Sequence, residues 1–319
     1  MRRMVGVVIF VGGLLVLLSN LLLKVQGVRG LGILGMFIGA AVFGLSFIPR
    51  PQPTADAPAP LPPAESATRV FYEPEPVFKN LRHHPRWLAG FLVLTFFGML
   101  YQVALTQRLG VERFAEDQAT RELEGGFVPL DKISADDYKQ AKIRAAIATA
   151  TVTKITAPFW VAGFVFLAML VLAGVFLLCV MAFGGRMNFW QALSVAIYGS
   201  LPAAVISSVL SLILLYIQSP TDMIPLEVQR HGLARADLGL LFRETNPMVN
   251  TLVRPVVYTL ASAIGLFQLY GWWVTVSGLK NAGEKNISGG SAWAIALMLW
   301  LLGMLLTTLL AILAPTFVA

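Results

Sequence analysis

The side chains that most often carry out enzymatic chemistry are few in this sequence and lie far apart along it. The 319 residues include three histidines, His83, His84 and His231, and a single cysteine, Cys179. Neither the GxSxG pattern of a serine nucleophile nor the HExxH pattern of a zinc peptidase occurs. Cys179 lies within a long apolar run, where a thiol behaves as a small hydrophobic side chain. We therefore predict no catalytic residue, no metal ligand and no cofactor, and we expect that the protein is not an enzyme.

Two glycine patterns resemble nucleotide-binding loops but stand in the wrong context. Gly30, Gly32 and Gly35 match the GxGxxG dinucleotide fingerprint, which requires a preceding strand and a soluble βαβ unit. Here the pattern opens an apolar run, so we expect these glycines, with Gly39 and Gly44 at four-residue intervals after Gly35 and Ala40, to allow close helix packing. Residues 278–285 approach a phosphate loop but lack its Gly-Lys pair and hydroxyl residue. We predict a helix end there, followed by a short basic loop.

The composition indicates a membrane protein. Apolar residues make up 57% of the chain and charged residues only 13%, about half the charged share of an ordinary soluble domain. The mean hydropathy of +0.73 disfavours a soluble globule, a disordered chain and a coiled coil. A single cysteine excludes a disulfide scaffold. The net charge of +7 is explained by basic cytoplasmic loops, so we expect no nucleic-acid partner.

Seven stretches are long and apolar enough to cross a bilayer, which needs about 20 mostly apolar residues. None of them contains Asp, Glu, Lys, Arg or His. We predict an all-α polytopic membrane bundle whose spans are residues 4–23, 30–48, 87–105, 158–183, 189–217, 255–279 and 291–314. The first span could instead be a signal peptide, but its apolar run is long and Lys24 stands where a small cleavage residue would be needed. We expect Pro202 to kink the fifth span.

Lys and Arg near the span ends favour an N-terminus inside and a C-terminus outside. With that orientation we expect a multi-pass protein of the bacterial cytoplasmic (inner) membrane. The segments assigned to the cytoplasm hold nine of the basic residues near the spans: Arg2, Arg3, Arg50, Lys79, Arg82, Arg86, Arg186, Lys280 and Lys285. The lipid bilayer is the first partner that the sequence implies.

Ion-coupled transport usually requires ionisable groups inside the membrane, and the predicted spans have none. Serines of the fifth span could instead line a path for a neutral solute. A carrier or channel for a neutral or lipid-like solute therefore remains the alternative function. The polar residues available within the spans include Gln102, Gln191, Ser194, Ser200, Ser207, Ser208, Ser211, Gln268 and Ser277.

The chain divides into three parts: an N-terminal transmembrane hairpin (1–48), a Pro-rich linker (49–69) and a five-span domain (70–319). The linker has prolines at seven positions between 49 and 63, so we expect an extended spacer that packs poorly. Residues 69–86 mix apolar and basic residues, which suits a segment on anionic headgroups, and Pro74 and Pro76 prevent one continuous helix. In the loop 106–157 we expect two helical pieces, the second opened by a capping box at Ser134 and ended before Pro158. In the loop 218–254 we expect a short amphipathic piece over 233–242.

Three blocks of the five-span domain resemble the Yip family of membrane proteins, named for interaction with Ypt/Rab GTPases. The first is Glu73-Pro74-Glu-Pro76-Val-Phe78 followed by Pro-Arg-Trp87. The second runs from Asn188 through Gln191-Ala-Leu and Tyr198 to Leu-Pro202. The third runs from Phe267 through Tyr270 to Gly278-Leu-Lys.

The resemblance implies a five-span core, a cytoplasmic N-terminal region and an outside C-terminus, and it is closest to the bacterial branch of the family. It implies structural or interaction roles for the motif positions rather than catalysis. We therefore expect a non-enzymatic protein that organises membrane partners or the bilayer, with membrane proteins or a second copy of the chain as partners. The motif positions are Glu73, Pro74, Pro76, Phe78, Trp87, Gln191, Tyr198, Pro202, Tyr270 and Gly278.

Overall fold

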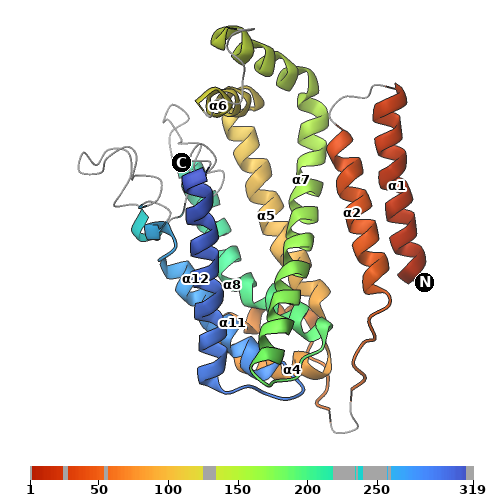
Figure 1. The fold of residues 1–319 in the computed structure, drawn as a ribbon, viewed down its shortest axis with the longest axis vertical. Coiled ribbons are helices and arrows are strands. Elements are labelled where there is room, and N and C mark those ends of the chain that lie inside the picture. Colours follow the sequence, from red (N-terminus) through yellow and green to blue (C-terminus); the bar gives the residue numbers. More distant parts are fainter. Residues whose placement is uncertain are drawn as a thin grey trace. The chain divides into compact units, whose positions relative to one another are not determined.

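The computed structural model is mostly α-helical over the residues that it describes, which are 2–23, 28–53, 57–124, 134–217, 234, 236–239, 257 and 260–313. The described elements follow one another along the chain in the order shown in Figure 1. They are α1 (Arg2–Leu23), α2 (Arg29–Leu45), α3 (Pro63–Arg69), α4 (Pro74–His83), α5 (Trp87–Leu109), α6 (Val111–Glu124), α7 (Ala135–Ala182), α8 (Phe189–Ile217), α11 (Leu266–Asn281) and α12 (Gly289–Leu313).

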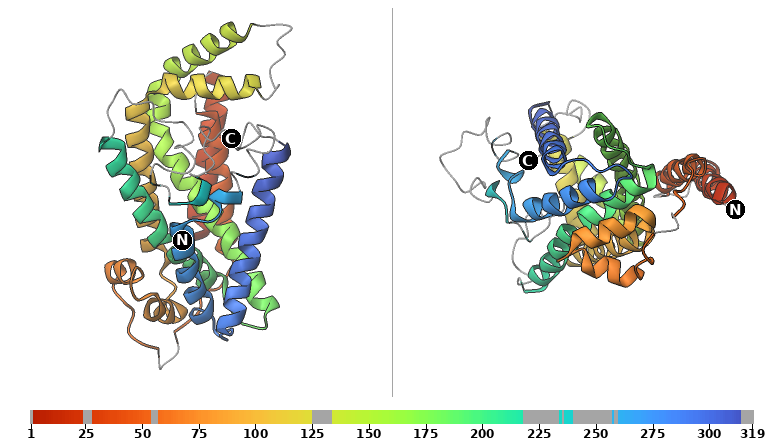
Figure 2. Two further views of the ribbon diagram at one scale, coloured as in Figure 1. Left: turned by 90° about the vertical axis from the view of Figure 1, so that its left-hand side faces the viewer. Right: turned by 90° about the horizontal axis from the view of Figure 1, so that it is seen from below.

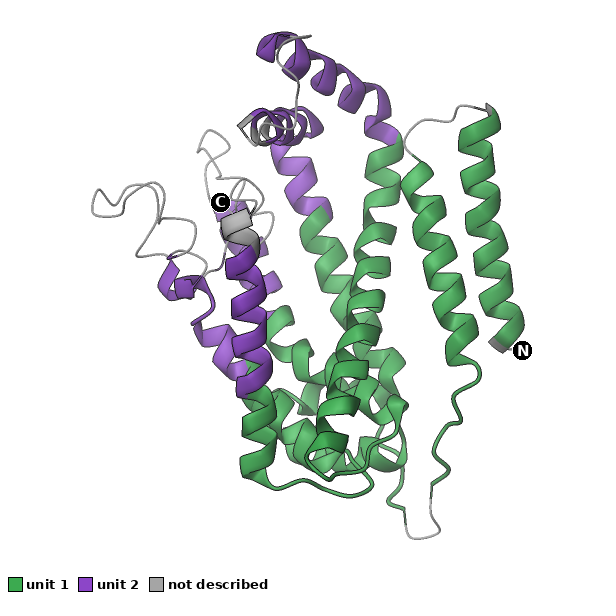
Figure 3. Cartoon of the chain, viewed as in Figure 1, with its two compact units in different colours: residues 1–102, 152–205, 271–296 green, residues 103–151, 206–270, 297–319 purple. Residues whose placement is uncertain are grey.

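The chain forms two compact units (Figure 3). Unit 1 comprises residues 1–102, 152–205 and 271–296, and unit 2 comprises residues 103–151, 206–270 and 297–319. Unit 1 therefore contains the helices α1 to α4 together with parts of α5, α7, α8, α11 and α12. All the residues of the candidate site below, Tyr270 excepted, belong to unit 1.

Within the described residues, five helices are long and apolar enough to cross a membrane. They lie at Arg3–Leu22, Trp87–Leu109, Ala135–Ala182, Phe189–Ile217 and Gly289–Leu309, and they correspond to the predicted first, third, fourth, fifth and seventh spans. The predicted second span is the shorter apolar helix α2, of 17 residues. The helical membrane architecture is thus confirmed, whereas the predicted number of seven spans is not.

The predicted sixth span is not one helix. Its first residues lie largely outside the described part of the chain, and a turn at residues 263–265 separates them from α11. At this turn the main chain bonds to another segment, because Leu266 N donates to Ala236 O (2.9 Å) and Leu238 N donates to Ile264 O (3.0 Å). These bonds replace the i to i−4 pattern of a helix, which accounts for the interruption. Most of the predicted amphipathic piece over 233–242 lies outside the described residues.

The loop between the third and fourth spans contains the two predicted helical pieces, α6 and the start of α7. Ser134 caps α7 as expected, because its Oγ accepts a hydrogen bond from Asp137 N (3.1 Å). The expected end before Pro158 is wrong, since α7 continues through Pro158 to Ala182. Proline normally disfavours the interior of a helix. In membrane helices it is tolerated, and here helical residues continue on both sides of Pro158.

Helices α1 and α2 lie side by side as a hairpin (Figures 1 and 2), and glycines allow their close contact. A Cβ on Gly39 would lie 2.3 Å from Phe10 N, and one on Gly13 would lie 2.6 Å from Met36 N. Of the fingerprint glycines, a Cβ on Gly32 would lie 2.8 Å from Leu17 N and one on Gly35 would lie 3.1 Å from Gly13 Cα, so they serve close packing, as predicted. Gly44 does not, because a Cβ there would meet nothing within 4 Å.

The Pro-rich linker is more ordered than predicted. Its last part forms α3, with Pro63 at the first helical position, where a missing N–H costs nothing. Upstream of α3, Trp190 Nε1 donates to Ile48 O (3.3 Å) and the Arg50 guanidinium lies 5.2 Å from the Trp190 ring centroid. The junction of the hairpin and the linker is thus held against the first turn of α8.

Candidate functional site

Helix α4 is amphipathic and buries its apolar face in unit 1. Val77 and Phe78 are fully buried and Leu81 is nearly so, whereas Glu75 and Lys79 are exposed. Pro74 and Pro76 lie in the first turn, where proline is tolerated, so the break that they impose falls between α3 and α4. The expectation that this segment lies on lipid headgroups is wrong for its apolar face, because that face packs against protein.

Phe78 rests on Gly278 of α11. A Cβ on Gly278 would lie 3.0 Å from two Phe78 ring carbons and 2.8 Å from Val195 Cγ1 of α8. The space for the Phe78 ring therefore depends on the missing side chain at Gly278. This contact brings α4, α8 and α11 together at one point.

Gln191 is fully buried and makes hydrogen bonds in two directions. Its Oε1 accepts from Asn188 N (2.7 Å), while Asn188 Oδ1 accepts from Trp190 N (3.0 Å). This reciprocal arrangement is a capping box that opens α8. Gln191 Nε2 donates in addition to Arg82 O at the end of α4 (2.7 Å). One side chain thus caps one helix and holds the end of another.

Tyr198 lies two turns further along α8 and is also fully buried. Its hydroxyl donates to Arg86 O (3.3 Å), immediately before α5. A Cβ on Gly90 of α5 would lie 3.0 Å from the Tyr198 ring, so this glycine allows the ring to fit. Gln191 and Tyr198 together fix both ends of the short connection between α4 and α5.

Asn80 fastens the linker to α4. Its Oδ1 accepts from Leu61 N (3.1 Å) and its Nδ2 donates to Ala59 O (2.8 Å). His84 Nε2 lies 2.9 Å from Pro58 O. Burial and the neighbouring charges of Arg82 and His84 lower the pKa of His83. The histidine pair thus borders a packed linker segment, and within the described residues no three His, Cys, Asp or Glu side chains gather as a possible metal site.

The outward face of α3 and α4 carries paired charges around an exposed tyrosine. Tyr72 is 67% exposed and lies between the two helices. Arg69 forms ion pairs with Glu65 (3.4 Å) and Glu73 (2.8 Å). Lys79 pairs with Glu75 (2.7 Å), and its hydrogen bond holds the pKa of that carboxyl below its usual value. Exposed ion pairs of this type contribute little to stability. We call the following set of residues the polar face: Glu65, Arg69, Tyr72, Glu73, Glu75 and Lys79.

Four of the ten predicted motif positions, Phe78, Gln191, Tyr198 and Gly278, meet in the packing just described. Pro74 is buried beside them at the start of α4, whereas Glu73 and Pro76 are exposed. Pro202 is buried further along α8, Trp87 faces a cavity, and Tyr270 belongs to unit 2.

The predicted solute path along the fifth span loses several of its serines to local hydrogen bonds. Ser194 Oγ donates to Trp190 O (2.9 Å) and Ser200 Oγ donates to Ala196 O (2.8 Å). Ser211 Oγ accepts from Ala234 N (3.0 Å) and is buried. These hydroxyls satisfy main-chain groups, which is a common structural use of serine in membrane helices.

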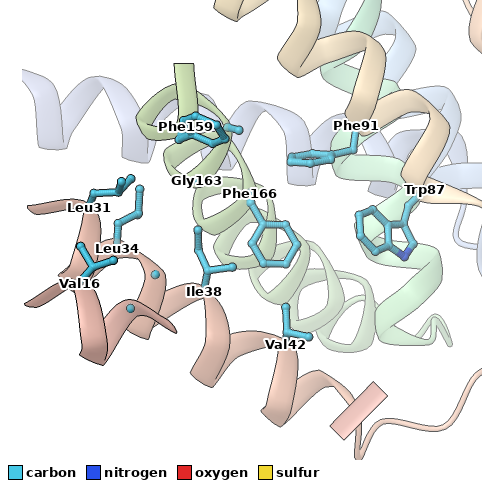
Figure 4. A pocket seen from close by; sticks show the side chains of 13 residues that line it. Val16, Leu31, Leu34, Ile38, Val42, Trp87, Phe91, Phe159, Gly163 and Phe166 are labelled. Carbon is cyan, nitrogen blue, oxygen red and sulfur yellow. The ribbon is translucent and has the colours of Figure 1, made fainter. Parts of the chain in front are cut away.

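An apolar cavity of about 480 Å³ lies between the hairpin and the helices α5 and α7 (Figure 4). Thirteen residues line it, and the Trp87 indole N–H is the one polar side-chain group among them. Trp87, Phe91 and Phe166 form one wall, with ring centroids 5.8 to 6.2 Å apart. Leu34, Ile38 and Val42 of α2 face them. The Trp87 motif position therefore belongs to a cavity wall, not to the packing around Gln191.

A family model described as the Yip1 domain matches residues 68–310. The chain belongs to the Yip1 domain family. With its five long apolar helices it is an integral, multi-pass membrane protein of that family. No curated protein and no solved structure matched the chain. The match begins at the end of α3, so the hairpin of α1 and α2 lies outside the Yip1 domain and the cavity lies between the two.

Three residues that support the Yip1-domain site were not singled out from the sequence. Asn188 begins the second motif, and Asn followed by Gln three residues later is also a signal for a capping box. Asn80 carried no signal, because its partners are main-chain groups about twenty residues away. Gly90 gave none either, since its role depends on the Tyr198 ring of another helix.

Proposed function

We propose that this Yip1-domain protein is a non-enzymatic organiser of membrane partners, and that it binds a membrane protein or a second copy of itself through the polar face. The observation that carries the proposal is the rigid attachment of α4. The hydrogen bond from Gln191 and the seat of Phe78 on Gly278 hold this helix on the ends of α8 and α11, and Asn80 joins it to the linker. A surface fixed in this way needs little ordering when a partner binds.

The proposal also covers the orientation of the chain and the type of membrane in which it lies. Basic residues near the span ends favour a cytoplasmic polar face and an outside C-terminus. We propose a bacterial inner-membrane protein of the bacterial Yip branch on this basis. The lack of ionisable residues in the predicted spans supports a role without catalysis or proton coupling.

The test is site-specific photocrosslinking in native membranes. Benzoylphenylalanine replaces Tyr72 (67% exposed) in one strain and Tyr216 (62% exposed, near the end of α8) in the other. We expect a discrete crosslinked band from position 72, identified by mass spectrometry as a membrane protein or as the chain itself, and no such band from position 216. Equal or absent protein adducts at the two positions would contradict the proposal.

The alternative, a carrier for a neutral or lipid-like solute, has one observation in its favour, which is the apolar cavity. Since its walls offer almost no hydrogen-bonding group, the cavity suits a lipid-like molecule better than a polar solute. Transfer of a fluorescent lipid between vesicles that contain the purified protein, faster than in vesicles without it, would favour the carrier over the organiser.

A further inference from the structure

The cavity between the hairpin and the Yip1 domain is an open one, and its walls favour an apolar occupant over water. A buried water needs two to four polar partners, and the thirteen lining residues supply one indole N–H. Its volume of about 480 Å³ falls in the range of roughly 300–1,000 Å³ that is usual for ligand sites. An apolar molecule is therefore the occupant that the chemistry of the walls favours.

The hairpin touches the Yip1 domain at small residues, and the cavity remains beside that contact. A Cβ on Gly163 of α7 would lie 2.5 Å from Leu34 Cδ2, and one on Gly30 would lie 2.4 Å from the Trp160 ring. At these two points a side chain of one helix rests directly on a glycine of the other. Toward Trp87, Phe91 and Phe166 the helices diverge and leave the cavity open (Figure 4).

The length of the cavity corresponds to one leaflet of a bilayer. On α2 its lining extends from Leu31 to Val42, which at 1.5 Å per residue is about 16 Å. That is roughly half of the hydrocarbon thickness of about 30 Å. Trp87 marks one end, next to the exposed Arg86, and tryptophan and arginine are typical of the membrane–water boundary.

We propose that this cavity binds one acyl chain of a membrane phospholipid, with the headgroup at the Trp87 end. The lining comes from helices of the predicted membrane spans, so the medium around it is lipid hydrocarbon. Three mutually contacting aromatic rings form a rigid wall against which a chain can lie without reorganising the protein. The phospholipid would thus occupy a site shared by the hairpin and the Yip1 domain.

The first test labels the full-length protein in vesicles with a phospholipid that carries a diazirine in the middle of one acyl chain. We expect adducts on the lining residues Ile38, Phe91 and Phe166 several times more often than on Leu92 and Phe164, which are 56% and 61% exposed. Equal labelling of both groups would show only the surrounding bilayer and would overturn the proposal. Suppression of this labelling by an equal concentration of free palmitate, added before irradiation, would overturn the assignment to a phospholipid.

The second test fills the cavity. Ala162→Phe places a ring in the lining, and Ala168→Phe places the same ring at an exposed position of the same helix. We expect native mass spectrometry to detect one retained phospholipid per chain in the unchanged protein and in Ala168→Phe, and none in Ala162→Phe. Unchanged helix content and thermal midpoint show that Ala162→Phe has folded, and retention of the lipid by this variant would overturn the proposal. Ala162→Phe leaves the polar face unchanged. Photocrosslinking from position 72 in this variant therefore tests the proposed function separately.

Discussion

Gln191 Nε2 donates a hydrogen bond of 2.7 Å to Arg82 O, and through this bond the first turn of α8 holds the last turn of α4. The Arg82 guanidinium continues the connection, because its Nη2 donates to Glu284 O, after α11, over 2.5 Å. Arg82 thus joins α4 to two other parts of unit 1 through its main chain and its side chain. The connection explains how a short helix without a span of its own keeps a fixed place on the Yip1 domain.

Gln191→Ala removes the second half of the capping box and the bond to Arg82 O together. We expect it to lower the free energy of unfolding by about 2–3 kcal/mol, because two hydrogen bonds are lost and buried main-chain groups lose their partners. Thermal unfolding in detergent measures the effect. Gln107→Ala, at an exposed position of α5, is the matched control and leaves the midpoint unchanged. Equal midpoints for the two variants would show that the Gln191 bonds contribute nothing.

Gly278→Ala tests the seat of the Phe78 ring. The new methyl group would lie 2.8 Å from Val195 Cγ1 and 3.0 Å from the ring, so side chains must shift. We expect a loss of about 1–3 kcal/mol, the usual cost of overpacking a core. Gly303→Ala on α12 is the control, because a Cβ there meets nothing within 4 Å. A smaller loss at Gly278 than at Gly303 would mean that α4 is not packed tightly against α11.

Sequence patterns predicted the long helices because each is a local apolar run with its own polar boundaries. They failed where the decisive contact is distant along the chain. The apolar side of α4 resembles a lipid-facing surface until Phe78 is seen to rest on Gly278, two hundred residues later. The interruption before α11 depends on main-chain bonds to residues 236–238, for which no sequence pattern exists.

At the candidate site, too, local features could be predicted from the sequence and distant contacts could not. The motif residues Gln191 and Tyr198 could be selected from their order along the chain, but their partners are main-chain carbonyls of Arg82 and Arg86. A carbonyl is present at every residue, so sequence alone does not identify which one accepts. The cavity was not predicted either, because it arises from the distance between helices of the hairpin and of the Yip1 domain.

The cluster of Glu122, Tyr138 and Lys142 in unit 2 makes the contact between α6 and α7 sensitive to acid. The Tyr138 hydroxyl donates to Glu122, and Lys142 Nζ lies 2.9 Å from the same carboxylate. These groups lower the pKa of Glu122 from its ordinary value of 4.5, the Tyr138 hydrogen bond most strongly. A lowered carboxyl pKa contributes stability that is complete above pH 4.5 and is lost as the pH falls through the folded-state value. We therefore expect α6 to separate from α7 below pH 4.5.

Spin labels at Glu116→Cys and Gln140→Cys, both exposed positions, report the distance between the two helices. The distance should stay constant from pH 7 to pH 5 and broaden at lower pH. In Glu122→Gln the distance distribution should be broad at every pH, because the charged acceptor is missing. A distribution that narrows on acidification would contradict the assignment.

The docking of the hairpin on the Yip1 domain gives the last prediction. Gly163→Leu would force α2 away from α7, because even a Cβ at this position lies 2.5 Å from Leu34 Cδ2. The hairpin itself should stay paired, since its own close contacts are at Gly13 and Gly39. Gly174→Leu, on the same helix with nothing within 4 Å, is the matched control.

A protease site inserted after Pro53 allows the hairpin to be cut from the Yip1 domain in the folded protein. We expect the cut hairpin to co-purify with the domain in the unchanged protein and in Gly174→Leu, and to be lost from Gly163→Leu. The hydrogen bond from Trp190 Nε1 to Ile48 O also joins the hairpin to the Yip1 domain. Since Ile48 precedes the cut, it stays on the hairpin fragment, and none of the variants changes this bond. A hairpin that remains bound in Gly163→Leu would therefore mean that this bond and the Arg50 contact with Trp190 hold it, rather than the α2–α7 packing. Loss of the hairpin from all three proteins would instead show that the linker is what keeps it in place.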